Sequence, residues 1–166
     1  MTAGTHDSRL TTADFMAFTI GAAFALLHLK RALGPDVSTP GLIVGSLAFL
    51  WLTATTAGPF VVLFRRMAGV ESEGPTVGDR LWLVLGAPWI LSSLFAWLQS
   101  GFPAIVLAVG VAEACLLAMI EVWRRWISVS AEEAKVAFSG AWTNRFGMIL
   151  AIAWPVQIAL LLIAST

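Results

Sequence analysis

One charged side chain, that of Glu113, interrupts the apolar segments of this sequence. Glu113 lies near the middle of the run Pro103–Val122, whereas every other charged residue lies outside such a run or at its end. A charged side chain at the centre of a bilayer costs about 2.5–3.5 kcal/mol, so Glu113 is expected to face other helices or a water-filled cavity. No Lys or Arg lies at the same depth, which favours a neutral, protonated carboxyl. Two interpretations stay open: a proton- or cation-linked site, or a structural hydrogen bond between helices.

Polar residues at matching depth in other apolar runs are the expected neighbours of Glu113. Their hydroxyl, amide and indole groups are the types that form hydrogen bonds between helices within a membrane. On its own helix, Glu113 shares one stripe with Gly110 and Glu121, and Gly110 would allow close approach of a second helix. The predicted mid-membrane polar site consists of Glu113, Thr53, Thr56, Ser92, Trp154 and Gln157.

Two further residues, His28 and Cys115, have side chains that could bind a metal or react, but the sequence supports such a role for neither. His28 could ligate the metal of a haem or a chlorophyll, but no second axial ligand accompanies it, and a packing role is favoured. Cys115 is the only cysteine and lies inside an apolar run, which excludes an intrachain disulfide and a thiolate metal cage. The sequence contains no metalloprotease, nucleophile-elbow or phosphate-binding motif. It therefore predicts no catalytic residues, no metal site and no cofactor.

Five apolar runs must position these side chains. They cover residues 15–33, 41–64, 81–98, 103–122 and 146–164, and each is long enough to cross a hydrocarbon core of about 30 Å as a helix. Hydrophobic residues make up 58% of the chain and charged residues only 12%, which does not fit an ordinary soluble domain. The predicted fold class is all-α: one transmembrane domain over residues 1–166, a bundle of five spans.

The first run needs a separate decision, because a cleaved signal peptide could look similar. No cleavage site of small residues follows it, and the basic pair Lys30-Arg31 stands where such a site would be neutral. We therefore expect a retained span. If this run lay on the membrane surface instead, the protein would have four spans.

The distribution of basic residues predicts the orientation. With five spans, eight of the ten Lys and Arg residues lie on the side of the N-terminus, and only Lys30 and Arg31 lie on the other. The positive-inside rule then predicts an inner (plasma) membrane protein with a cytoplasmic N-terminus and an outer C-terminus.

The last cytoplasmic loop and the tryptophans give two further structural predictions. Ser130 and Glu133 form a capping box that predicts a short helix over 131–139, either interfacial or solvated. The chain has eight tryptophans. Trp51, Trp89 and Trp154 lie deep in their runs, where an indole N–H needs an acceptor, so these three should face other helices.

The expected function follows from what the chain offers. Minimal mass outside the apolar runs and small-residue faces favour an accessory or structural membrane subunit that acts by helix–helix association. The alternative is a small oligomeric transporter or channel that uses Glu113. An enzyme is not expected, and neither is a nucleic-acid partner, because the net charge is zero and no dense basic cluster is present. The expected partners are the lipid bilayer and other membrane subunits or a second copy.

Overall fold

The regular elements of this computed structural model are all helices within the residues it describes, 10–32, 39–69, 75–97, 102–128 and 141–165. This confirms the all-α prediction for those residues. The predicted helix over 131–139 lies outside them. The elements are α1 (Thr12–Ala32), α2 (Thr39–Met67), α3 (Val77–Leu94), the 3-10 turn η1 (Phe95–Trp97), α4 (Phe102–Ser128), α6 (Trp142–Ile152) and α7 (Trp154–Ser165).

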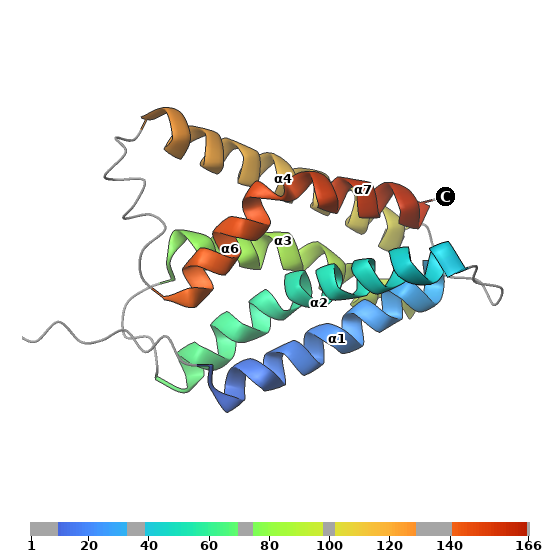
Figure 1. Cartoon of the computed structure of the whole chain (residues 1–166), viewed down its shortest axis with the longest axis horizontal. Coiled ribbons are helices and arrows are strands. Elements are labelled where there is room, and N and C mark those ends of the chain that lie inside the picture. Colours follow the sequence, from blue (N-terminus) through green and yellow to red (C-terminus); the bar gives the residue numbers. More distant parts are fainter. Residues whose placement is uncertain (1–9, 33–38, 70–74, 98–101, 129–140, 166) are drawn as a thin grey trace, which may run out of the picture.

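The helices form an elongated bundle, and they run back and forth along its long axis (Figure 1). α1 and α2 pack as an antiparallel pair, α3 lies against α1, α2, α4 and α6, and α7 packs on α4. α1, α3 and α6 begin at one end of the bundle, where α2 and α4 finish (Figure 1). α6 and α7 follow each other in the same general direction, so together they make one pass.

Among the residues that the structure describes, three helices are long and apolar enough to cross a membrane: α1, α2 and the Pro103–Arg124 part of α4. The other two predicted runs fall short for visible reasons. α3 has 18 residues and carries Asp79 and Arg80 in its first turn, and the last pass is divided into segments of 11 and 12 residues. The structure therefore supports an all-helical membrane protein with three such helices.

Proline chemistry explains the break in the last pass. Pro155 has no N–H to donate to the carbonyl of Ala151, so one hydrogen bond of the regular helix is missing at this point. α6 ends at Ile152 and α7 starts at Trp154, with Ala153 as the junction. Pro59 and Pro88, by contrast, lie inside the continuous helices α2 and α3.

Helices α1 and α3 each begin with a turn that contains polar residues, so each helix starts a few residues before the apolar run predicted from the sequence. In α3, Thr76 caps the backbone N–H of Asp79 at 3.3 Å, and the Asp79 carboxylate accepts from the backbone N–H of Thr76 at 2.9 Å. In α1, Thr11 and Asp14 make the same reciprocal pair, at 3.3 and 2.8 Å. Such a capping box satisfies N–H groups that have no partner within the helix.

The closest helix crossing joins α3 to α6 at glycines. A Cβ on Gly78 would lie 1.9 Å from the backbone oxygen of Asn144, and one on Gly147 would lie 2.0 Å from the backbone oxygen of Gly78. The Asn144 side chain locks this crossing, because its Oδ1 accepts from the Gly78 N–H at 2.9 Å. Any larger residue at these glycines would force the two helices apart.

Candidate functional site

A hydrogen-bonded chain of buried side chains crosses the middle of the bundle. The Trp89 indole N–H on α3 donates to Oε1 of Gln157 on α7 at 2.9 Å. The amide Nε2 of Gln157 then donates to the Thr55 hydroxyl on α2, also at 2.9 Å. All three side chains are at most 1% exposed. The Gln157 amide thus bridges a donor and an acceptor that would otherwise be buried without partners, and it ties three helices together.

His28 on α1 extends this chain toward the end of the bundle where α1 finishes. Its Nε2 lies 2.8 Å from the backbone oxygen of Trp89 and 2.9 Å from the hydroxyl oxygen of Ser93. A carbonyl only accepts, so the geometry assigns the proton to Nε2. The imidazole also meets the Trp89 ring edge-on, with the ring centroids 5.1 Å apart. His28 therefore connects α1 to α3 as a hydrogen-bond donor.

A small cavity adjoins His28. Its volume is about 40 Å³, and its lining consists of His28, Leu29, Ala32, Ala48, Leu52, Trp89 and Leu160. This space admits water-sized molecules. It is far too small for a haem or chlorophyll macrocycle, so the ligand role that the sequence left open for His28 finds no room in this cavity.

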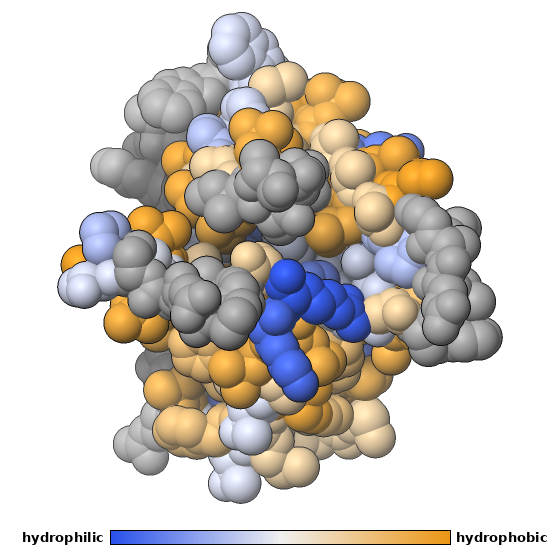
Figure 2. All heavy atoms as spheres, turned by 90° about the vertical axis from the view of Figure 1, so that its right-hand side faces the viewer, coloured by the Kyte–Doolittle hydropathy of each residue, from blue (hydrophilic) through white to orange (hydrophobic). Residues whose placement is uncertain are grey.

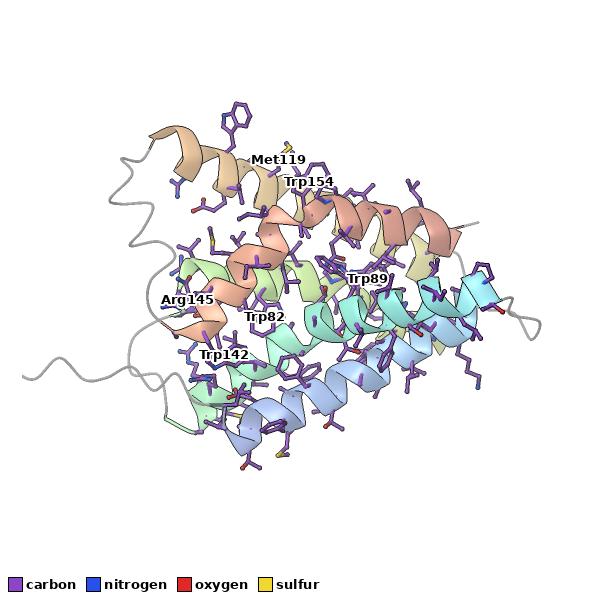
Figure 3. All side chains as sticks on the ribbon, viewed as in Figure 1. Trp82, Trp89, Met119, Trp142, Arg145 and Trp154 are labelled. Atoms are coloured by element: carbon purple, nitrogen blue, oxygen red, sulfur yellow. The ribbon has the colours of Figure 1, made fainter. Side chains whose placement is uncertain are left out.

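Trp82 and Thr56 make a second polar contact layer in the core. The Trp82 indole lies against Gly58, where a Cβ would be 2.2 Å from the ring, and its N–H donates to the Ala54 oxygen at 2.8 Å. The Thr56 hydroxyl lies 3.0 Å from the Gly21 oxygen on α1. Figure 3 shows Trp82 and Trp89 pointing into the interior of the bundle, with Trp154 at the junction of α6 and α7.

The residues of the predicted polar site are only partly brought together. Gln157 enters the central network, where its amide forms hydrogen bonds with Thr55 and Trp89. Thr56 is buried and bonded to backbone, whereas Ser92 is buried and Thr53 is half-buried with no hydrogen-bond partner for its hydroxyl among the described residues. The backbone oxygen of Trp154 accepts from the Cys115 thiol at 3.8 Å.

In the isolated chain, Glu113 does not face this polar site. Its side chain is exposed on the outer face of α4, near the middle of the apolar stretch Pro103–Arg124. The reason is the rotational setting of α4. The helix packs Ala114, Cys115 and Ala118 inward, and each of them is at most 3% exposed. This packing turns position 113 outward.

The rest of that outer face is apolar and unpartnered in the chain. Met119 stands out from α4 on this side (Figure 3). Three exposed alanines, Ala104, Ala108 and Ala112, follow each other at four-residue spacing on a flank of α4 that is turned 100° or more around the helix from Glu113. The large apolar side chains exposed on α4 are Ile105, Val109, Leu116, Leu117, Met119, Ile120 and Trp123, each at least 40% exposed.

A third polar group, which sequence reasoning missed, lies at the end of the bundle where α1 begins. Nη1 of Arg65 contacts the Asp14 carboxylate at 3.1 Å, and the two side chains are only 2% and 1% exposed. The Arg65 guanidinium also lies 5.6 Å from the centre of the Trp142 ring, a cation–π contact. The capping residue Thr11, three positions before Asp14, was the sequence signal that this carboxylate belongs to a helix start.

These three polar groups are suited to holding helices together. Within the described ranges, no cluster of three or more His, Cys, Asp or Glu side chains could hold a metal ion. The described helices form an all-α bundle with hydrogen-bonded polar groups in its interior, and three of these helices are long and apolar enough to cross a membrane, which supports a membrane protein. Comparison with known proteins gave no match: no family model, curated protein or solved structure is significantly similar to this chain.

Proposed function

We propose that this chain is a five-span membrane protein that acts by association with another transmembrane helix, through the outer face of α4. The observation that carries the proposal is the exposed carboxyl of Glu113 in the middle of an apolar helix. Facing lipid, this group would lack the hydrogen-bond partners that a polar side chain needs in hydrocarbon. A partner helix could supply a hydrogen-bond partner, and the exposed side chains that flank Glu113 on α4, Val109, Leu116, Leu117 and Ile120, give that helix an apolar surface to pack against.

The proposed orientation keeps the N-terminus in the cytoplasm and the C-terminus outside the inner membrane. Among the described basic residues, Arg65 and Arg66 end α2, Arg80 is in the first turn of α3, and Arg145 is in the first turn of α6. These helix ends all lie at one end of the bundle (Figure 1). Lys30, in the last turn of α1, lies at the other end. This asymmetry supports a cytoplasmic location of the arginine-rich end.

The simplest partner for the outer face of α4 is a second copy of the chain, because this association requires no other protein. Two protonated Glu113 carboxyls could pair across the interface, each donating one hydrogen bond and accepting another. A separate membrane subunit with a hydroxyl, amide or basic side chain at the same depth would satisfy Glu113 equally well. The two occupants differ in whether the purified protein associates with itself.

The test measures self-association by energy transfer between donor- and acceptor-labelled copies of the full chain in liposomes. Glu113→Leu should lower the association constant by about fivefold, because hydrogen bonds between membrane helices contribute about 1 kcal/mol. Glu113→Gln, which keeps a donor and an acceptor, should retain most of the association. Glu121→Leu is the matched control, since Glu121 pairs with Arg124 near the helix end.

Two results would count against the proposal in its simplest form. If the wild-type chain is monomeric in liposomes and co-purifies with no membrane subunit from its native source, α4 has no helical partner. If Glu113→Leu associates as well as the wild type, the carboxyl does not contribute to the interface.

A small oligomeric transporter remains the second candidate, because the same exposed carboxyl would lie at a subunit interface in an oligomer. In that case Glu113→Gln should abolish proton-linked flux into liposomes while leaving the oligomer intact. Association without flux favours the first proposal.

A further inference from the structure

A long apolar groove runs between α1 and α2 on the outside of the bundle. Its volume is about 390 Å³, and every lining residue except Ser46 is apolar or glycine: Leu26, Leu29, Leu42, Gly45, Ser46, Phe49 and Leu50. It lies away from α4 and does not depend on the association proposed above. Its contributors run along α2 from Leu42 to Leu50, so the groove follows the helix axis for about 12 Å, at ~1.5 Å per residue.

A positive charge stands at one end of this groove. Lys30 follows Leu26 by four residues and therefore lies on the same face of α1, one turn nearer the helix end. Arg31 is also exposed but is turned about 100° away from Lys30 around the helix. Figure 2 looks onto this end of the molecule and shows a small, strongly hydrophilic patch among mainly apolar side chains. In a bilayer, a lysine at a helix end reaches the headgroup level.

We infer that this groove binds one acyl chain of an anionic phospholipid, with the lipid phosphate at Lys30. The charge pattern selects this occupant: an apolar groove with a lysine one helical turn beyond Leu26 matches a hydrocarbon chain attached to a phosphodiester. The hydroxyl of Ser46 is the one polar side chain along the groove, so the lining offers little to a polar peptide.

Native mass spectrometry of the purified full chain in a neutral detergent tests this inference. Phosphatidylglycerol and phosphatidylcholine with identical acyl chains are titrated separately, and the singly bound species is quantified. We expect tighter binding of phosphatidylglycerol, and Lys30→Gln should weaken that binding by about fivefold. Arg31→Gln is the matched control: it removes the same charge from the next residue and should have a clearly smaller effect.

The acyl chain requires its own variant. Ser46→Phe places a ring in the groove and should lower the retention of both phospholipids, while Thr19→Phe, on an exposed position of α1 outside the groove, should not. Glycerophosphoglycerol, which is the headgroup without chains, should fail to compete with phosphatidylglycerol. This last measurement needs no variant, so it holds even if Ser46→Phe does not fold.

Three results would overturn the inference. Equal affinity for the two phospholipids would remove the role of the charge, and equal effects of Lys30→Gln and Arg31→Gln would show a diffuse surface attraction. Competition by the chain-free headgroup would show that the phosphate binds without the groove.

Discussion

The buried ion pair between Asp14 and Arg65 gives the sharpest test of how this bundle is held together. At the observed separation of 3.1 Å and an effective dielectric constant of about 20, the attraction between the two charges is about 5 kcal/mol. Much of it is offset by removing both charges from water. Replacing only one of the two residues should therefore lower the unfolding free energy, because the remaining charge stays buried without an opposite charge beside it.

The perturbation is a double-mutant cycle with Asp14→Asn and Arg65→Met. Each single variant should lose about 3–5 kcal/mol of unfolding free energy, since breaking a buried pair leaves one charge unpaired. Arg65→Met also removes the cation–π contact with Trp142, so its loss should be the larger. The double variant should recover part of the loss, with a coupling energy of about 1–3 kcal/mol.

The assay follows helix loss by far-ultraviolet circular dichroism as SDS is added to the protein in mixed micelles. Arg66→Met is the control, because Arg66 is the exposed neighbour of Arg65 in the same last turn of α2. It should change the unfolding free energy by less than about 0.5 kcal/mol. If the Asp14 and Arg65 losses simply add, the two side chains are not coupled and the reasoning fails.

Two other predictions concern the helix contacts. Gln157→Leu should lower the unfolding free energy by about 1–3 kcal/mol, because it leaves the Trp89 N–H and the Thr55 hydroxyl without their partner. Unfolding in SDS measures this loss. The double variant Trp89→Phe with Gln157→Leu should lose less unfolding free energy than the sum of the two single variants. Gly78→Ala should cost more than about 3 kcal/mol or prevent folding, because the new Cβ would overlap the Asn144 backbone oxygen; near-wild-type unfolding of this variant would show that the α3–α6 crossing is looser than the structure indicates.

Much of the helical framework could be predicted from the sequence, because apolar runs of about 20 residues between polar loops have few stable alternatives. The starts of the helices were less predictable. The sequence places the charged residues Asp14 and Asp79 outside the apolar runs, but each lies in the first turn of its helix and is buried. Capping and helix crossing stabilise these polar groups, and hydropathy does not measure either effect.

For the candidate site, the sequence identified polar residues of the interior but not which of them pair. The sequence identified Gln157, Thr56 and the deep Trp89 as interior polar groups, because such side chains need partners within an apolar environment. It missed the pairing of Trp89 with Gln157, since the distance between them along the chain carries no information on which helices pack together. His28 was favoured as a packing residue, and its contacts with Trp89 and Ser93 are of that kind.

By itself, the sequence determined that this chain is helical and that Glu113 is the one charged residue near the middle of an apolar run. Both properties depend on local composition, which the order of residues gives directly. Only the tertiary structure decided which way Glu113 points. Close packing of Ala114, Cys115 and Ala118 against the bundle sets the rotation of α4, and that rotation turns Glu113 to the outer face.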